Sequence, residues 1–122
     1  MTQESERDCL EAKFVANTQI VKLNGHCLID DDHIREIGSE LYRAVDATTS
    51  KYFLVNMSNV TALSSMMIGQ LLNVRNRCEK ADLKFRVCDL NPEVAESLKI
   101  MNLKELLSVY PTEADAIADA SD

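Results

Sequence analysis

Segments with the pattern of β-strands alternate with segments with the pattern of α-helices along most of this 122-residue chain. Residues 52–55 (YFLV) form an unbroken apolar run of strand length, which is typical of a strand buried on both faces. Residues 83–88 alternate between apolar and polar and predict a further strand. Apolar residues at helical spacing occupy positions 34–45 and 67–78. This alternation predicts an α/β fold, with a mostly parallel or mixed β-sheet and helices packed against it.

The chain length fits one domain, since domains commonly have about 100–150 residues. Residues 13–23 have the pattern of extended chain interrupted by a turn at residues 16–18, and we expect two strands there. A short last strand is predicted at residues 108–110. We therefore expect a single domain over residues 13–122, preceded by a flexible lead-in over residues 1–12.

Cap residues predict where the helices begin. Side chains that accept hydrogen bonds from free N–H groups, or a proline at the first helical position, favour a helix start. Asn102 stands where a left-handed residue would end a helix, a conformation that asparagine tolerates. Helix starts are predicted at Asp30–Asp32, Ser64–Ser65, Asn91–Pro92 and Thr112.

The charge of the chain argues against two classes of partner. The net charge is −7, and no cluster of lysine and arginine is present. Proteins that bind nucleic acids or anionic membranes need such a cluster to neutralise phosphate groups, so neither nucleic acid nor a membrane surface is an expected partner. No apolar run approaches the roughly 20 residues that cross a bilayer, so membrane insertion is not expected.

The expected location is the cytoplasm. The first eight residues are polar and acidic and do not resemble a signal peptide. The four cysteines form no C-x-x-C pair. Reduced thiols are therefore the expectation, as in most cytosolic proteins.

No cofactor, metal or enzymatic activity is expected. The acidic run at Asp30 fails as a calcium loop, because its sixth and twelfth positions would be Arg35 and Leu41 instead of glycine and glutamate. His26, Cys27 and His33 lack the spacing of paired zinc ligands. The sequence also contains no glycine-rich phosphate loop and no nucleophile–base set that can be placed together.

The segment from Tyr52 to Leu72, YFLVNMSNVTALSSMMIGQLL, resembles the centre of the STAS family, the sulfate-transporter and anti-sigma-factor-antagonist family. The family pattern there is a hydrophobic strand ending in Asp or Asn, a short loop, and D-S-[ST]-G-L-G at a helix start. Residues 91–94 with Leu98 and residues 102–103, and then residues 112–116, resemble the downstream segments of the family. The resemblance covers roughly residues 14–118.

This resemblance implies a protein-binding module. In bacterial antagonists of the family, the serine that follows the motif aspartate is phosphorylated by a serine kinase, usually an anti-sigma factor, and a phosphatase reverses the change. The unmodified antagonist binds the anti-sigma factor. The matching serine is Ser65, and Asn56 matches the polar end of the central strand.

The sequence departs from the family motif. Ser64 replaces the aspartate, Met66 the next hydroxyl residue and Met67 the first glycine, while Gly69 keeps the second glycine. Met67 fits the buried stripe of the helix, and we expect Met66 to be exposed. The expected partner-binding surface consists of Asn56, Ser58, Asn59, Thr61, Ser64, Ser65, Met66, Met67 and Gly69.

Several alternatives stay open. Either serine can be a helix cap, the commonest role of a serine at this position. Ser65 is the first choice for phosphorylation and Ser64 the second. The chain can also be a scaffold or accessory subunit of a signalling assembly or transport system, never phosphorylated. A weak homodimer is a further expectation.

Overall fold

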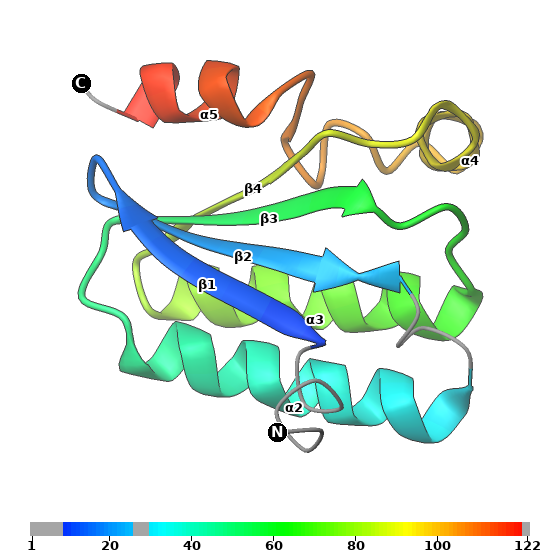
Figure 1. Cartoon of the computed structure of the whole chain (residues 1–122), viewed down its shortest axis with the longest axis horizontal. Coiled ribbons are helices and arrows are strands. Elements are labelled where there is room, and N and C mark those ends of the chain that lie inside the picture. The colour runs from blue at the N-terminus through cyan, green and yellow to red at the C-terminus, as the bar shows by residue number, and fades with distance from the viewer. Residues whose placement is uncertain (1–8, 26–29, 121–122) are drawn as a thin grey trace, which may run out of the picture.

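The computed structural model, which describes residues 9–25 and 30–120, shows one sheet with helices on both faces (Figure 1). Its strands lie in the order β1-β2-β3-β4-β5. Strand β1 pairs antiparallel with β2, whereas the pairs from β2 to β5 are all parallel. The strands are β1 (Leu10–Val15), β2 (Thr18–Asn24), β3 (Tyr52–Asn59), β4 (Lys84–Cys88) and β5 (Val109–Tyr110). The predicted α/β fold with a mixed sheet is confirmed.

Four helices in the described part of the chain cover the sheet. Helices α2 (Asp31–Ala47) and α3 (Ser65–Lys80) lie on one face, and α5 (Glu113–Ala120) lies on the other (Figure 1). The fourth, α4 (Pro92–Ile100), follows β4 on the same side as α5. Each parallel pair from β2 to β5 is joined by a crossover that contains one of these helices, as a parallel sheet requires.

Apolar side chains fill both sides of the sheet. The larger cluster lies against α2 and α3 and includes Phe53 and Val55, both fully buried. The smaller cluster, on the α5 side, contains Ile20, Leu54 and Cys88 with Ala116. Since neighbouring residues of β3 enter opposite clusters, the unbroken apolar run at residues 52–55 is explained.

The helix caps agree with the predictions. Asp30 Oδ1 accepts a hydrogen bond from the N–H of His33 at 2.9 Å, and Asn91 Oδ1 accepts one from Glu93 at 3.1 Å. Thr112 Oγ1 accepts one from the N–H of Asp115 at 3.1 Å. Asn102 has φ 59°, the left-handed conformation expected after α4.

Two boundaries differ from the expectation. Strand β3 runs to Asn59, four residues beyond the apolar run at residues 52–55 that predicted it. The reason is that β2 continues beside it, with Asn24 opposite Asn59 after a register irregularity. Strand β1 begins at Leu10, so residues 10–12 of the expected lead-in belong to the sheet.

The cysteines differ from the expectation as well. Cys78 and Cys88 are free and buried, but Cys9 is disulfide-bonded, so the expectation of reduced thiols fails there. Cys27 and His26 lie outside the described residues. Within the described ranges, no three histidine, cysteine or acidic side chains are grouped to hold a metal. No helix in the same ranges has the length and hydrophobicity needed to cross a membrane.

Candidate functional site

The candidate site is formed by the end of β3, the connection that follows it and the first turn of α3. The chain leaves the sheet at Val60, which is fully buried and donates its N–H to the carbonyl of Met57 at 3.0 Å. This anchor holds the connection close to the core while its polar residues face outward. The exposed members of the predicted surface are Ser58, Asn59, Thr61, Ser64 and Ser65.

The two adjacent serines have different positions. Ser64 is the N-cap of α3, with extended backbone, and its Oγ accepts a hydrogen bond from the N–H of Met67 at 3.1 Å. Its carbonyl accepts the first helical hydrogen bond, from Ile68 at 3.0 Å. The capping role that either serine could fill therefore belongs to Ser64.

Ser65 is the first residue of the helix and is exposed. Its hydroxyl makes no hydrogen bond with any residue that the structure describes. No acidic residue lies in the first turn of α3. An anion at Ser65 would therefore meet free N–H groups and the positive end of the helix dipole, without a neighbouring carboxylate in that turn.

The residues that follow divide between core and surface. Met67 is fully buried, as the helical stripe predicted. Met66 is half-buried and packs against the larger cluster, so the prediction that it is exposed is only partly met. The helix surface at Gly69 is open, since an added Cβ would meet no neighbouring atom within 4 Å.

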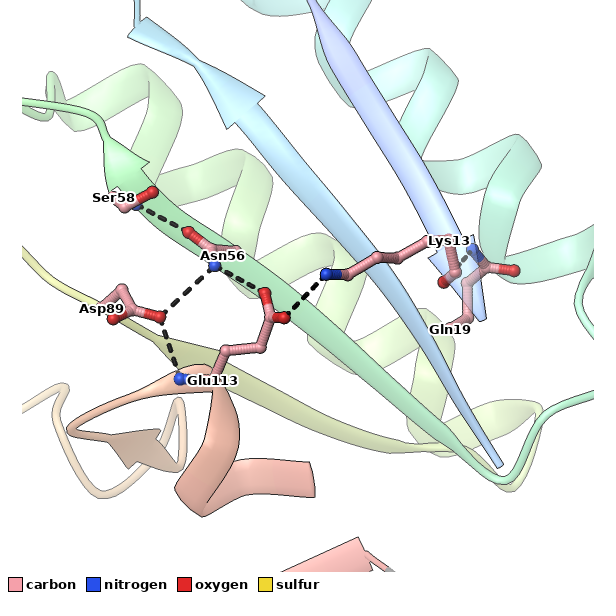
Figure 2. A network of polar contacts seen from close by, with 6 residues as sticks. All are labelled: Lys13, Gln19, Asn56, Ser58, Asp89 and Glu113. Atoms are coloured by element: carbon pink, nitrogen blue, oxygen red, sulfur yellow. Dashed lines mark hydrogen bonds and ion pairs between the residues drawn. The ribbon is translucent and has the colours of Figure 1, made fainter. Parts of the chain in front are cut away.

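Asn56 is buried and is the centre of a part-buried polar network (Figure 2). Its side-chain N–H groups donate to Glu113 Oε1 at 2.7 Å and to Asp89 Oδ2 at 3.3 Å. Its side-chain oxygen, Oδ1, accepts a hydrogen bond from the N–H of Ser58 at 2.9 Å. Asn56 is 6% exposed, so together with Met67 it supports the predicted surface from below and offers a partner little direct contact.

The network extends across the sheet from β1 to the start of α5. Asp89 Oδ2 also accepts from the N–H of Glu113 at 2.9 Å, which fixes the start of α5. Lys13 of β1 pairs with Glu113 Oε2 at 2.9 Å. Burial raises the pKa of Glu113, but hydrogen bonds from Lys13 and Asn56 outweigh it and hold the pKa below its ordinary value. The carboxylate of Glu113 therefore stays charged near neutral pH and keeps the network closed.

A second contact fixes the end of β3. Asn59 Nδ2 donates to Asn24 Oδ1 at 3.2 Å. Beside it, the backbone of Gly25 comes so close to Asn59 that an added Cβ would lie 2.2 Å from the Asn59 carbonyl oxygen. Only glycine leaves room for this approach. The surface around Ser58 and Asn59 thus depends on the end of β2.

Asp89, Glu113 and Lys13 belong to the site but were not predicted from the sequence. Asp89 directly follows the apolar end of β4, as Asn56 lies near the end of β3. Polar residues at the carboxyl ends of neighbouring parallel strands meet at one edge of a sheet, so this signal was available. Glu113 gave no comparable signal, because its position depends on how α5 returns to the sheet.

Comparison with known proteins gives a family and a fold. The family model described as "STAS domain" matches residues 10–116. A search of curated proteins gave no match. The match to the family model spans all the described strands and helices except the end of α5.

Solved structures with similar folds include an anti-sigma-factor antagonist (STAS) domain protein from Planctomyces limnophilus, with TM-score 0.81, 16% identity, and coverage of 93% of this chain and 98% of that one. An anti-sigma factor antagonist from Mycobacterium paratuberculosis gives TM-score 0.80, 18% identity and 93% coverage of both chains. A sulfate transporter family protein from Wolinella succinogenes gives TM-score 0.72, 18% identity and 88% coverage of both. At these identities the likeness concerns the fold alone.

Proposed function

The chain belongs to the STAS domain family, and from this we propose that it is a phospho-switchable protein-binding module of the anti-sigma-factor-antagonist type. Its partner would be an anti-sigma factor with serine-kinase activity, or a related regulator. A phosphatase would reverse the modification. In this role the chain is a substrate of the kinase and not itself an enzyme, and we propose that it acts in the cytoplasm, where such a kinase finds ATP.

The observation that carries the proposal is the exposed Ser65 hydroxyl beside a neighbour that already caps the helix. Because Ser64 bonds to the N–H of Met67, Ser65 is not needed to hold the end of α3. A kinase could modify Ser65 without removing the cap. This supports Ser65 over Ser64 as the acceptor.

The physical effect of a phosphate at Ser65 would be on the partner and not on the fold. The group adds about −1.5 to −2 charges. At the N-terminus of a helix this charge is locally favourable, so α3 should remain folded. The polar network around Asn56 would keep the end of β3 in place in both states. Bulk and negative charge on an otherwise unchanged surface would then prevent the partner from docking.

The test is a capture experiment with the phosphate mimic Ser65→Asp. The wild-type chain, immobilised, should retain its partner from an extract of the source cell, and Ser65→Asp should retain at least about tenfold less. Ser65→Ala removes the acceptor without adding charge and should bind like wild type. Ser64→Asp is the matched control, because it adds the same charge one residue earlier, at the N-cap position, where aspartate also caps helices.

A second measurement tests the modification itself. The chain is incubated with the captured kinase and ATP, and the phosphorylated peptide is identified by mass spectrometry. We expect phosphate on Ser65 in the wild type and none in Ser65→Ala. Phosphate found only outside residues 64 and 65 would refute the switch and leave a binding module whose regulation lies elsewhere.

The alternative is a scaffold or accessory subunit that is never phosphorylated. Two observations favour it: the departures from the family motif at Ser64, Met66 and Met67, and the fold similarity to a sulfate transporter family protein. A scaffold should bind its partner equally well as wild type and as Ser65→Asp. Equal capture of the two proteins would therefore decide for this alternative.

The Cys9 disulfide bears on the proposed location, since disulfides are rare in the cytosol. Rapid alkylation of cell extracts before reduction would show whether Cys9 is oxidised in the cell. A chain found only in an oxidising compartment would contradict the cytoplasmic proposal.

A further inference from the structure

Within residues 9–25 and 30–120, the outer edge of β1 is an unpaired sheet edge. Strand β1 is an edge strand of the sheet, and among the described strands it pairs only with β2. All residues from Glu11 to Val15 are exposed, and Phe14 is 61% exposed. No other strand in the described ranges pairs with this edge. A strand edge of this length is a template for pairing with another chain.

The pairing with β2 determines which backbone groups point outward. The N–H of Asn24 donates to the carbonyl of Cys9 at 2.9 Å, and the register places Leu10 opposite Leu23. In an antiparallel pair, alternate residues exchange hydrogen bonds with the neighbouring strand. The odd-numbered residues of β1 therefore bond to β2. The N–H and C=O groups of Leu10, Ala12 and Phe14 point away from the sheet.

We propose that two copies of this chain form a homodimer through β1, antiparallel, with Ala12 of one copy opposite Ala12 of the other. In this register Leu10 pairs with Phe14 of the second copy, and both use outward-pointing backbone groups. About six backbone hydrogen bonds would form. The two five-stranded sheets would become one continuous sheet across the twofold axis.

Charge complementarity selects this register. With Ala12 on the axis, Glu11 lies opposite Lys13 of the second copy, and Lys13 lies opposite Glu11. A shift by two residues, the smallest that keeps the backbone groups paired, places Glu11 opposite Glu11 or Lys13 opposite Lys13. Both shifts oppose like charges. Lys13 also pairs with Glu113 of its own chain, but its side chain is 58% exposed and remains accessible.

The apolar side chains fit the same arrangement. Leu10, Ala12 and Phe14 share the face of the sheet that carries α2, because β1 alternates and Leu10 packs against the larger cluster. Pairing places each exposed Phe14 beside Leu10 of the other copy, where an aromatic–aliphatic cross-strand pair is favourable. The dimer is weak, since each copy carries a net charge of −7 and the interface is one short strand.

The first experiment is analytical ultracentrifugation of the full chain in about 0.15 M salt, over concentrations from about 5 to 500 µM. We expect reversible dimerisation of the wild type in this range. Ala12→Pro should weaken it at least about tenfold, because proline removes an outward N–H that the fold does not use. Circular dichroism and thermal unfolding report whether this variant is folded.

The second experiment tests the register with charge variants. Glu11→Lys leaves a lysine at both positions, so that each lysine faces a lysine of a second copy. Lys13→Glu does the same with two acids, so each variant alone should be monomeric. Mixed in equal amounts, the two variants should form a heterodimer, because every opposed pair is then of opposite charge. This result cannot arise from misfolding of either variant.

The proposal is overturned if the wild type remains monomeric throughout the range, or if Ala12→Pro and the single charge variants dimerise as the wild type does. It is also overturned if the mixed variants fail to pair while each is folded. These outcomes leave the proposed function untouched, because the proposed phosphoacceptor Ser65 lies at the start of α3, after β3, and β2 separates β3 from β1.

Discussion

At the scale of single residues, the distinction between Ser64 and Ser65 is the central result. The hydroxyl groups are adjacent in sequence, yet one closes the end of a helix and the other is free of hydrogen bonds to the described residues. A phosphoacceptor and a cap have conflicting requirements, since a cap must stay bonded to the backbone. If Ser65 is the phosphoacceptor, as proposed, two adjacent serines satisfy both requirements, and Ser64 acts as the cap at the position where the family motif has aspartate.

Glu113 provides a residue-scale prediction about pH. Its pKa is lowered in the folded protein, so the stability that its charge contributes is present above its unfolded pKa of 4.5 and is lost as the pH falls through the folded pKa. Glu113→Gln should lower the free energy of unfolding by about 0.5–1.5 kcal/mol at neutral pH. The difference from wild type should shrink in acid. Urea unfolding at several pH values measures it.

The matched control for Glu113→Gln is Asp115→Asn. Asp115 lies in the same first turn of α5 but is exposed. Its variant should show a smaller loss of stability at neutral pH. A loss for Glu113→Gln that persists unchanged down to about pH 3 would contradict the role assigned to the Glu113 charge.

At the scale of elements, the strands and helices followed from local patterns, whereas the polar network did not. Apolar periodicity and caps predicted β3, α3 and α4 because these signals lie within each segment. The end of β3 was predicted too early, since Asn56, Ser58 and Asn59 are polar and their pairing depends on β2. Asn56 was expected at the site, but its bonds to Asp89 and Glu113 join residues 33 and 57 positions apart. Such contacts exist only once the sheet has formed.

Helix α3 provides the element-scale prediction. Glycine is costly inside a helix, and the space around Gly69 is open, so Gly69→Ala should raise the free energy of unfolding by about 0.5–1 kcal/mol. If the partner approaches the helix closely there, as proposed, the same variant should reduce partner capture. Chemical denaturation and the capture experiment measure the two effects separately.

The control for Gly69→Ala is Asn73→Ala, one turn further along α3 and exposed. It should also stabilise the helix slightly, because alanine has the higher helix propensity, but it should leave partner capture unchanged. Capture by Gly69→Ala equal to that of wild type would place Gly69 outside the binding surface.

At the scale of the whole molecule, the two apolar clusters on opposite faces of the sheet each contain one free thiol. Cys78 belongs to the larger cluster and Cys88 to the smaller. Burial raises the pKa of Cys78 to about 12 and also raises the pKa of Cys88, which is further affected by the carboxylate of Asp89. Because the thiolate is the reactive form, both cysteines should resist alkylation in the native protein.

Pulsed alkylation across a urea series, read for each cysteine by mass spectrometry, tests whether the two faces unfold together. In a cooperative domain, Cys78 and Cys88 should become reactive at the same urea concentration. Labelling without reductant leaves the Cys9 disulfide intact. Reaction of Cys88 at a clearly lower concentration would show instead that α5 detaches from the sheet before the rest of the molecule unfolds.

The placement of Glu113 has a consequence for biosynthesis. The serines of the site lie before α3 or at its first residue, but the acid that bonds to Asn56 belongs to α5, which leaves the ribosome after all five strands of the sheet. A nascent chain that has emerged only as far as β5 has an uncovered apolar face and an Asn56 amide without its acceptor on Glu113. Translation must therefore proceed through α5 before the proposed kinase or partner can meet the finished surface.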